Sequence, residues 1–270
     1  MATRVIVAGA TGWAGSAVVR GILSAPDLSL VGAVARRSAG VDVGVALGMA
    51  RQGVTVAPRV AAALEVPADV LVDYTQPQAV KGNALEALRM GVSVVVGTSG
   101  LTKADYEEIG GAAERAGRGV IAAGNFSITA ALAKRFALMA ARHIPSWELI
   151  DYADPSKIDA PSGTVQELAE ELGEVRRPRR EVPIEHVFGA AEARGADILG
   201  TQVHSLRLPS YVISFEALFG LKDERLTIRH DAGAGAEPYV AGTLLAVRRV
   251  GEIRGLVRGL DRLLFGDIPS

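Results

Sequence analysis

The fold of this chain is decided near its start, by the stretch Val5-Ile6-Val7-Ala8-Gly9-Ala10-Thr11-Gly12-Trp13-Ala14-Gly15. Its first four residues are apolar and mostly β-branched, which predicts a buried strand. Glycine lets the backbone turn tightly and lie close to a phosphate group, and the helix that follows offers free N–H groups at its start. We therefore predict a strand, a dinucleotide-binding turn over residues 9–15 and a helix. The alternative is a plain glycine-rich turn that packs the helix on the sheet.

The same alternation of strand and helix continues through the first 124 residues. Apolar runs predict strands at 4–8, 28–34, 70–74, 92–97 and 119–123, and helical patterns fall at 12–23, 76–90 and 103–116. Buried strands that alternate with helices indicate a parallel sheet covered on both faces. This half of the chain therefore predicts an α/β fold, a Rossmann-type doubly wound parallel sheet.

After about Asn125 the pattern becomes that of an α+β domain. Helices are predicted at 127–142 and 163–172, and strands at 147–152, 202–207, 211–219 and 224–230. We expect an open mixed sheet, whose uncovered edges and faces favour oligomerisation. Two more helices, at 237–250 and 255–264, are expected to return to the first domain. The predicted division is a dinucleotide-binding domain of residues 1-124 and 236-270 and a substrate-binding and oligomerisation domain of residues 125-235.

Composition excludes several classes of function. Hydrophobic residues make up 49% of the 270 residues and charged residues 22%, with a formal net charge of -1, so nothing favours nucleic acid or an anionic membrane surface as a partner. The chain has no cysteine, which rules out disulfides and thiolate chemistry. No apolar run is long enough to cross a membrane, and no pair of histidines has metal-ligand spacing. We expect a cytoplasmic protein that binds no metal.

The residues after the second predicted strand bear on the choice of cofactor. An acidic residue there accepts hydrogen bonds from the ribose 2′-hydroxyl of NADH. This chain instead has Ala35-Arg36-Arg37-Ser38, and guanidinium groups bind phosphate oxygens through charge-assisted hydrogen bonds. We predict NADPH in preference to NADH, bound by Arg36 and Arg37, with a merely solvated Arg37 as the alternative.

Two further loops follow predicted strands at the edge where ligands of doubly wound sheets bind. They are Gly97-Thr98-Ser99-Gly100 and Ala123-Gly124-Asn125-Phe126-Ser127. Their small residues permit close approach of a nicotinamide ring and its ribose. The alternative is that both are ordinary connections between strand and helix.

A third loop, Lys157-Ile158-Asp159-Ala160-Pro161-Ser162-Gly163-Thr164, precedes an amphipathic helix. Ser162 is a suitable N-cap, and the amides of Gly163 and Thr164 with two hydroxyl groups form a site for a carboxylate or a phosphate. Lys157 lies five residues before Ser162 and can neutralise a carboxylate or polarise an imine nitrogen. An ordinary capped helix beside a surface lysine is the alternative.

These motifs together resemble the 4-hydroxy-tetrahydrodipicolinate reductase (dihydrodipicolinate reductase) family of bacterial lysine biosynthesis, over essentially the whole chain. The resemblance rests on the opening glycine turn and on the segments 73–77, 96–100, 124–127, 157–164, 203–209 and 228–231. It implies an NAD(P)H-dependent reductase, usually a homotetramer, with a Rossmann domain and a sheet domain that moves on closure. It also implies that Lys157 is catalytic and that Gly163 and Thr164 hold a carboxylate of a cyclic imine substrate.

The chain departs from the family just before Lys157. Typical members have two adjacent histidines there, the first a proton donor and the second a substrate ligand, whereas this chain has Ala153 and Asp154. Ala153 cannot transfer a proton, and general acid catalysis typically contributes ~10²–10⁴-fold in rate. Asp154 places an anion beside the substrate, where it repels a dicarboxylate and attracts an amine.

Three hypotheses follow from this departure. In the first, the chain reduces 4-hydroxy-tetrahydrodipicolinate to tetrahydrodipicolinate, and the proton comes from water, Lys157, Tyr152 or His204. In the second, it is a paralogue, an NADPH-dependent imine reductase or amine dehydrogenase whose amine-bearing substrate suits Asp154. In the third, it is a non-catalytic NADPH-binding regulatory protein. The retained Lys157 and Ser162-Gly163-Thr164 argue against the third, because a sensor needs neither.

Overall fold

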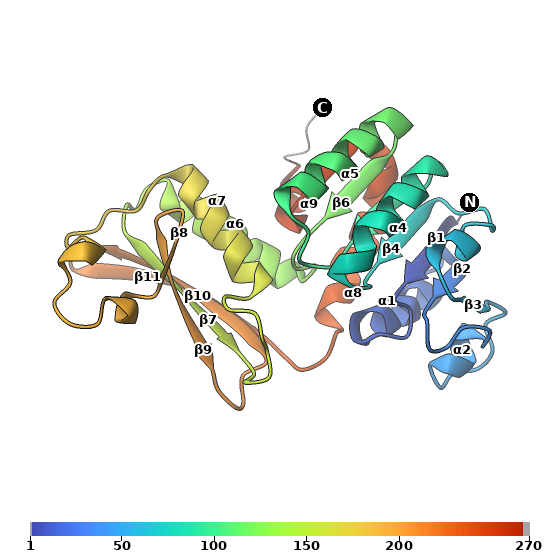
Figure 1. Cartoon of the computed structure of the whole chain (residues 1–270), viewed down its shortest axis with the longest axis horizontal. Helices are drawn as coiled ribbons and strands as arrows, with labels where there is room; N and C mark the ends of the chain where they lie inside the picture. Colours follow the sequence, from blue (N-terminus) through green and yellow to red (C-terminus); the bar gives the residue numbers. More distant parts are fainter. Residues whose placement is uncertain (1, 267–270) are drawn as a thin grey trace. The chain divides into compact units, whose positions relative to one another are not determined.

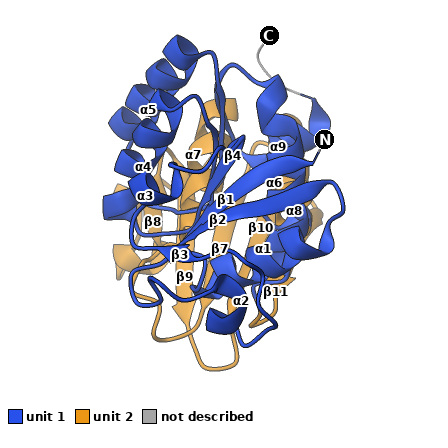
Figure 2. Ribbon diagram, turned by 90° about the vertical axis from the view of Figure 1, so that its right-hand side faces the viewer, with its two compact units in different colours: residues 1–128, 236–270 blue, residues 129–235 orange. Residues whose placement is uncertain are grey.

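The computed structural model describes residues 2–266 and divides them into two compact units. The first unit runs as far as Ile128 and resumes at Ala236, and the second comprises Thr129–Gly235 (Figure 2). The chain therefore leaves the first unit once and returns to it once. Within the described residues, none of the helices combines the length and the hydropathy that a membrane crossing requires.

The first unit is built on a sheet of seven parallel strands. The strands are β1 (Thr3–Ala8), β2 (Leu28–Val34), β3 (Val56–Ala57), β4 (Val70–Asp73), β5 (Ser93–Val96), β6 (Gly119–Ala122) and β12 (Gly255–Arg258). Their order across the sheet is β12-β6-β5-β4-β1-β2-β3. The connections run outward in one direction from β1 to β3 and in the other from β4 to β6, so the switch point lies between β1 and β4. The predicted doubly wound parallel sheet is thus confirmed.

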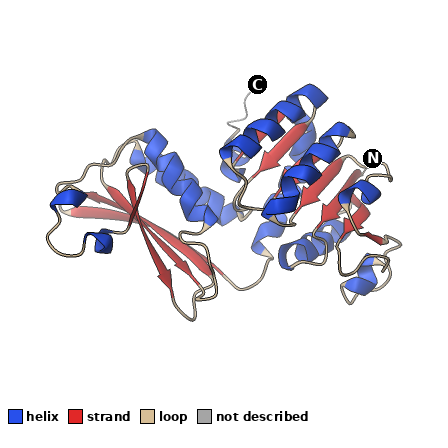
Figure 3. Cartoon of the chain, viewed as in Figure 1, coloured by secondary structure: helices blue, strands red, loops and turns tan. Residues whose placement is uncertain are grey.

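Helices cover both faces of this sheet (Figures 1 and 3). They are α1 (Trp13–Ser24), α2 (Val43–Ala46), α3 (Val60–Ala63), α4 (Pro77–Arg89), α5 (Lys103–Ala116), α8 (Pro238–Arg249) and α9 (Leu260–Phe265), with a short 3₁₀ turn η3 (Val250–Glu252). Apolar residues of α3, α4 and α5 form one core with alternate strand residues such as Ile6 and Val94. On α1, Gly21 lies so close to Val240 of α8 that these two helices pack against each other directly.

The prediction for residues 255–264 was wrong in part. The pattern indicated one helix, but β12 forms first and only then α9. Leu256 and Val257 pair with Val120 and Ile121 of β6, and Gly255 and Gly259 on either side have positive φ values of 82° and 92°. A partner strand far away in the chain supplies the pairing, which local periodicity does not reveal. The short elements β3, α2 and α3 were not predicted either.

The second unit places two helices on one face of a mixed sheet. Its elements are α6 (Ile128–Ala141), β7 (Trp147–Ala153), α7 (Gly163–Val175), η1 (Ile184–His186), η2 (Ala191–Arg194), β8 (Ala196–Ile198), β9 (Thr201–Arg207), β10 (Ile213–Leu221) and β11 (Glu224–Ala232). The strand order is β11-β10-β7-β9-β8, and β7 and β9 pair in parallel while the other neighbours are antiparallel. This confirms the predicted open mixed sheet.

The side chains of β7 alternate between the two faces of this second sheet. Leu149 belongs to the core with Leu168 and Leu172 of α7, so Asp151 and Ala153 also point to the helical face. Tyr152, between them, points to the other face. This alternation decides which residues can reach the loop before α7.

Candidate functional site

The glycine turn between β1 and α1 is built so that only glycine fits. Gly9 has a φ of 81°, and a Cβ there would overlap the backbone carbonyl of Tyr74. A Cβ at Gly15 would overlap the carbonyl of Gly9, so the first turn of α1 lies directly on the loop. Gly12 caps α1 without a side chain, and the first turn holds no acidic residue. The first amides of α1 therefore offer hydrogen bonds and a partial positive charge, as a phosphate site requires.

A cavity of about 940 Å³ opens beside this turn, at the carboxyl ends of β1, β2 and β4. Its lining includes Gly9, Thr11 and Gly12 from the turn, together with Arg36, Arg37 and Arg59. Among the described residues, the three arginine side chains have no hydrogen-bonding or ionic partner. Glycine amides on one side and three unpaired guanidinium groups on the other fit a dinucleotide with an extra phosphate.

Arg59 was missed by the sequence reasoning. It is the N-cap of α3, and the pairing of Val34 with Ala57 brings its segment beside the end of β2. β3 has only two residues, so no periodic pattern announces it. No local signal in the sequence places Arg59 near Arg36. The pairing of β2 with β3 brings the two residues to the same cavity.

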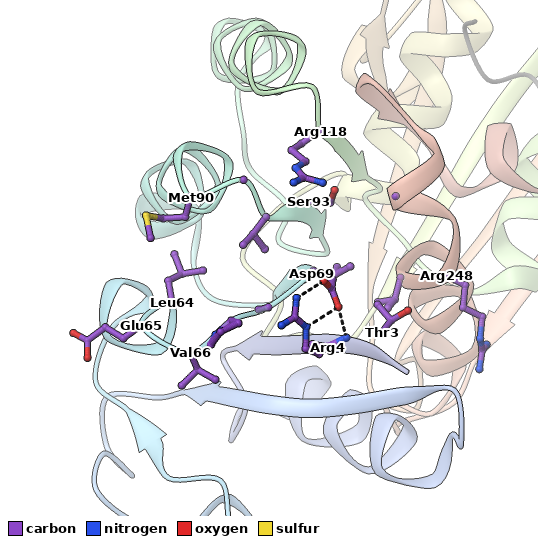
Figure 4. Close-up of a pocket in the computed structure, with 17 residues that line it drawn as sticks. Thr3, Arg4, Leu64, Glu65, Val66, Asp69, Met90, Ser93, Arg118 and Arg248 are labelled. Atoms are coloured by element: carbon purple, nitrogen blue, oxygen red, sulfur yellow. Dashed lines mark hydrogen bonds and ion pairs between the residues drawn. The ribbon is translucent and has the colours of Figure 1, made fainter. Parts of the chain in front are cut away.

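A second cavity, of about 560 Å³, lies at the opposite, amino-terminal ends of β1, β4 and β5 (Figure 4). Arg4 and Asp69 face each other there in a bidentate pair, with Nη2 to Oδ1 at 2.7 Å and Nε to Oδ2 at 3.1 Å. Ligands of doubly wound sheets bind at the carboxyl ends of the strands, where the cavity beside the glycine turn lies. The first cavity is therefore the candidate cofactor site, and the second is not.

The loop after β4 braces the cofactor cavity. Asp73 is fully buried and accepts hydrogen bonds from the amide and hydroxyl of Thr75, at 2.8 and 2.6 Å, and from Asn83 at 2.8 Å. The neighbouring Tyr74 hydrogen-bonds Thr243 of α8 at 2.7 Å. Burial raises the pKa of the Tyr74 phenol well above its usual range, so it stays neutral and serves as a structural group.

The two other predicted cofactor loops lie at the ends of β5 and β6 but do not line this cavity. At Gly97 a Cβ would collide with the Tyr74 ring, so glycine is required there for packing. Phe126 is 1% exposed and its ring meets Tyr74 edge-on at 6.3 Å. Its side chain is therefore part of the core. The cofactor role predicted for these two loops stays a prediction. It concerns Gly97, Thr98, Ser99, Ala123, Gly124, Asn125 and Phe126.

The loop between β7 and α7 begins with a tight turn. Asp154 accepts hydrogen bonds from the amide and the hydroxyl of Ser156, at 2.9 and 2.6 Å, and the Lys157 amide bonds back to the Asp154 carbonyl. Asp followed by Pro155 is the usual start of such a turn. The Ser156 hydroxyl is the main cause of a lowered pKa at Asp154, which is therefore ionised at neutral pH. The Lys157 ammonium lies 2.8 Å from Asp159 Oδ1 in the same loop.

Ser162 is the N-cap of α7, as predicted, but its side chain forms no capping hydrogen bond. Ser162 is 3% exposed, and its buried Oγ has no hydrogen-bonding partner. The Ser162 amide donates to Asp151 Oδ2 at 3.0 Å. An unpaired hydroxyl beside the first amides of α7 suits an incoming carboxylate oxygen.

The structure separates two suggested proton donors from this loop. Tyr152 donates to Glu216 at 3.2 Å, and His204 Nε2 lies 2.8 Å from Glu148. Both side chains are on the face of the second sheet that points away from α7. Ala153 points toward α7 but is fully buried. Within the loop itself, residues 154–162, Lys157 is the one cationic side chain.

Two descriptions of one protein family match consecutive parts of the chain. Residues 3–126 match the family described as "Dihydrodipicolinate reductase, N-terminus", and residues 127–264 match its C-terminus. The 4-hydroxy-tetrahydrodipicolinate reductase of Desulfitobacterium hafniense is 41% identical over 263 residues, 97% of this chain and 98% of the relative. That of Moorella thermoacetica is 40% identical over 263 residues, 97% of each chain.

A solved structure shows the same relationship in three dimensions. Dipicolinate-bound dihydrodipicolinate reductase from Paenisporosarcina sp. TG-14 has a TM-score of 0.81 and 30% identity, over 97% of this chain and 99% of that one. Both halves of the chain thus match the two parts of one enzyme family in order and in full. The chain belongs to the dihydrodipicolinate reductase family, the NAD(P)H-dependent reductases of lysine and diaminopimelate biosynthesis.

Proposed function

We propose that the chain reduces 4-hydroxy-tetrahydrodipicolinate to tetrahydrodipicolinate with NADPH, and that the loop of Lys157 holds the substrate. The NAD(P)H-dependent reduction of this compound is the reaction of the family to which the chain belongs. Substrate and product differ by one hydroxyl group. In the net reaction, the hydroxyl group and a hydrogen of the neighbouring carbon would leave as water, which makes a C=C bond conjugated with the C=N bond. The cofactor would then supply a hydride to the conjugated carbon, and one proton would complete the product.

One observation supports the substrate site above all: a cation and a buried, unpaired hydroxyl lie in a single short loop. Lys157 supplies the charge, and Ser162 supplies the hydroxyl at the start of α7. The amides of Gly163 and Thr164 add donors at the positive end of the helix. Asp154 is ionised and lies at the beginning of the loop. We propose that it faces the substrate and disfavours substrates with a large net negative charge.

Lys157 is the proposed catalytic residue. Its ammonium neutralises negative charge that develops on the substrate nitrogen as hydride arrives at the conjugated carbon. Since Ala153 has no proton to give, the proton comes from Lys157 itself or from a water molecule that it orients.

NADPH rather than NADH is the proposed cofactor. The turn of residues 9–15 would hold its pyrophosphate, and Arg36, Arg37 and Arg59 would surround its 2′-phosphate. No acidic residue lies among the residues that line the cavity. A ribose 2′-hydroxyl would therefore find no carboxylate there to accept its hydrogen bond.

A homotetramer is the proposed assembly, formed through the face of the second sheet opposite α6 and α7. Ile150, Leu206 and Leu218 lie on that face, next to polar residues such as Tyr152 and Glu216. An open sheet face with apolar residues is commonly buried by self-association. Light scattering of the purified protein tests this assembly, and a monomer would contradict it.

The activity is tested by NADPH oxidation with freshly generated 4-hydroxy-tetrahydrodipicolinate, beside a panel of cyclic imines and amino ketones. We expect turnover of the dipicolinate precursor at roughly 1 s⁻¹ or more. Turnover of amine-bearing imines alone would show that Asp154 has redirected the enzyme to another substrate. NADPH binding without any turnover would indicate a regulatory protein.

A further inference from the structure

A buried ion pair lies under the substrate loop of the second unit. Asp151 of β7 is fully buried, and its Oδ2 lies 2.8 Å from Arg207 Nη2 of β9, whose side chain is 17% exposed. The Ser205 hydroxyl donates a hydrogen bond to the same oxygen at 3.2 Å. Buried pairs of this kind gain little net stability, because desolvation offsets their attraction. What they do provide is a defined geometry between the elements that carry them.

This ion pair attaches the loop to the sheet at two points. Asp151 Oδ2 accepts the amide of Ser162, which fixes the start of α7. Arg207 Nη2 donates to the backbone carbonyl of Asp159 at 2.6 Å, which fixes the middle of the loop. The side chain of Asp159 in turn holds Lys157 at 2.8 Å. Both anion-binding features of the loop are therefore held through one carboxylate and one guanidinium.

Three polar atoms of this cluster remain buried without a partner: Asp151 Oδ1, Arg207 Nε and Ser162 Oγ. A buried network kept only for stability normally satisfies its polar atoms. Here the three unsatisfied atoms lie next to the proposed substrate loop, so stability alone does not account for the network. We infer that Asp151 and Arg207 are positioning residues, which set the distance between Lys157 and the α7 amides so that both act on the same substrate. This inference rests on the proposed substrate site.

Substitution of Arg207 by lysine separates positioning from folding. Arg207→Lys keeps the charge near Asp151, but an ammonium cannot also reach the Asp159 carbonyl in the same planar geometry. We expect kcat/KM for the substrate to fall about 10²-fold, since a shift of an ångström costs that much. Dipicolinate should bind more weakly by calorimetry, and the Kd for NADPH should stay unchanged.

Arg180→Lys is the matched control. Arg180 is also mostly buried in the second unit, at 20% exposure, and binds Asp197 and Gln202 without touching the loop. It should lower thermal stability to a similar extent and leave kcat/KM and dipicolinate affinity unaltered. Equal losses of dipicolinate affinity in the two variants, or no loss in Arg207→Lys, would overturn the positioning role.

Amide hydrogen exchange gives a readout that does not depend on activity. In Arg207→Lys, exchange over residues 155–164 should accelerate at least tenfold while the strands of the second sheet stay protected, and unchanged exchange there would refute the inference. If Arg207→Lys does not fold, the neutral pair Asp151→Asn with Arg207→Gln replaces it in the same measurement. If the wild-type protein neither turns over the precursor nor binds dipicolinate, the proposed function fails, whereas the exchange result still decides whether the pair positions the loop.

Discussion

The ammonium of Lys157 lies 2.8 Å from Oδ1 of Asp159, two residues further along the same loop. The side chains are 27% and 48% exposed, so the pair is solvated and its net contribution to stability is small, at most about 1 kcal/mol. An ammonium has three N–H donors, so Lys157 can bind a substrate carboxylate, as proposed, while it keeps its contact with Asp159. We propose that the pair keeps Lys157 in position for the substrate.

Replacement of Lys157 by alanine should lower kcat by about 10²–10³-fold, because it removes a charge that acts on the developing transition state. The Kd for NADPH should not change. Steady-state kinetics and a fluorescence titration with NADPH measure the two quantities. Lys222→Ala, in the exposed turn between β10 and β11, is the control and should behave as wild type. Equal losses in kcat and in NADPH affinity would contradict the catalytic role proposed for Lys157.

The three arginines at the cofactor cavity predict a specific change of cofactor preference. Arg59→Ala should raise the KM for NADPH about tenfold or more, since one charge-assisted hydrogen bond contributes ~1.5–3 kcal/mol, and leave the KM for NADH unaltered. Arg36→Ala with Arg37→Ala should shift the preference further toward NADH. Arg51→Ala, which is exposed and outside the cavity, is the control. If all three arginines are replaced by alanine and the ratio of NADPH to NADH use is unchanged, the proposed binding of the 2′-phosphate by these arginines is contradicted.

Glycine 15 can be tested by adding a single methyl group. Gly15→Ala would force a Cβ against the carbonyl of Gly9, so we expect loss of NADPH binding and a lower melting temperature. Gly82→Ala, in α4 with open space around its Cβ, should instead raise stability by up to about 1 kcal/mol. Differential scanning calorimetry compares the two, and NADPH binding retained by Gly15→Ala would contradict the described turn.

Asp154 is expected to weaken the binding of a dicarboxylate. Asp154→Asn removes one exposed negative charge whose repulsion is already weakened by water, so the Kd for dipicolinate should fall by about threefold or less. The gain in dipicolinate affinity should disappear at a salt concentration of about 1 M, where exposed charges are almost fully screened. Ser156→Ala, which disrupts the same turn without a change of charge, is the control. An Asp154→Asn variant that binds dipicolinate more weakly would show that Asp154 does not oppose the dianion.

His230 predicts how stability depends on pH. Its ring stacks on Phe215, its Nε2 lies 3.1 Å from the Thr129 hydroxyl, and its buried Nδ1 has no partner. Burial lowers the pKa of His230, and Asp231 only partly opposes this. Below the unfolded value of about 6.5 the unfolded chain therefore binds a proton that the folded chain does not, so stability falls as pH decreases from there to the folded pKa. Urea denaturation at several values between pH 7 and 5 gives the unfolding free energy as a function of pH. This free energy should fall less steeply with decreasing pH in His230→Gln than in wild type, and an equal dependence in both would contradict the prediction.

The loop before α7 shows how far sequence reasoning reached into the site. The cation, the N-cap position of Ser162 and the helix that follows were all predicted, because they are close neighbours in the chain. The missing capping bond of Ser162 was not predicted, because the residue type and its position alone favour a capped helix. Tyr152 and His204 were considered as proton donors because they are near in sequence or alike in chemistry, but strand alternation turns both away from the loop.

The strand, glycine turn and helix at the start and the doubly wound parallel sheet followed from the sequence alone, as did the prediction of a ligand loop from Lys157 to Thr164. These features depend on periodicity and on residue types within about ten positions of one another, where local sterics and capping act. The folded structure was needed to show that 255–258 forms a seventh strand, that Arg59 lies at the same cavity as Arg36, and that Arg207 binds Asp151 from 56 residues away. Each depends on which strands pair, and strand pairing is set by burial across the whole unit, a property that no short stretch of sequence contains.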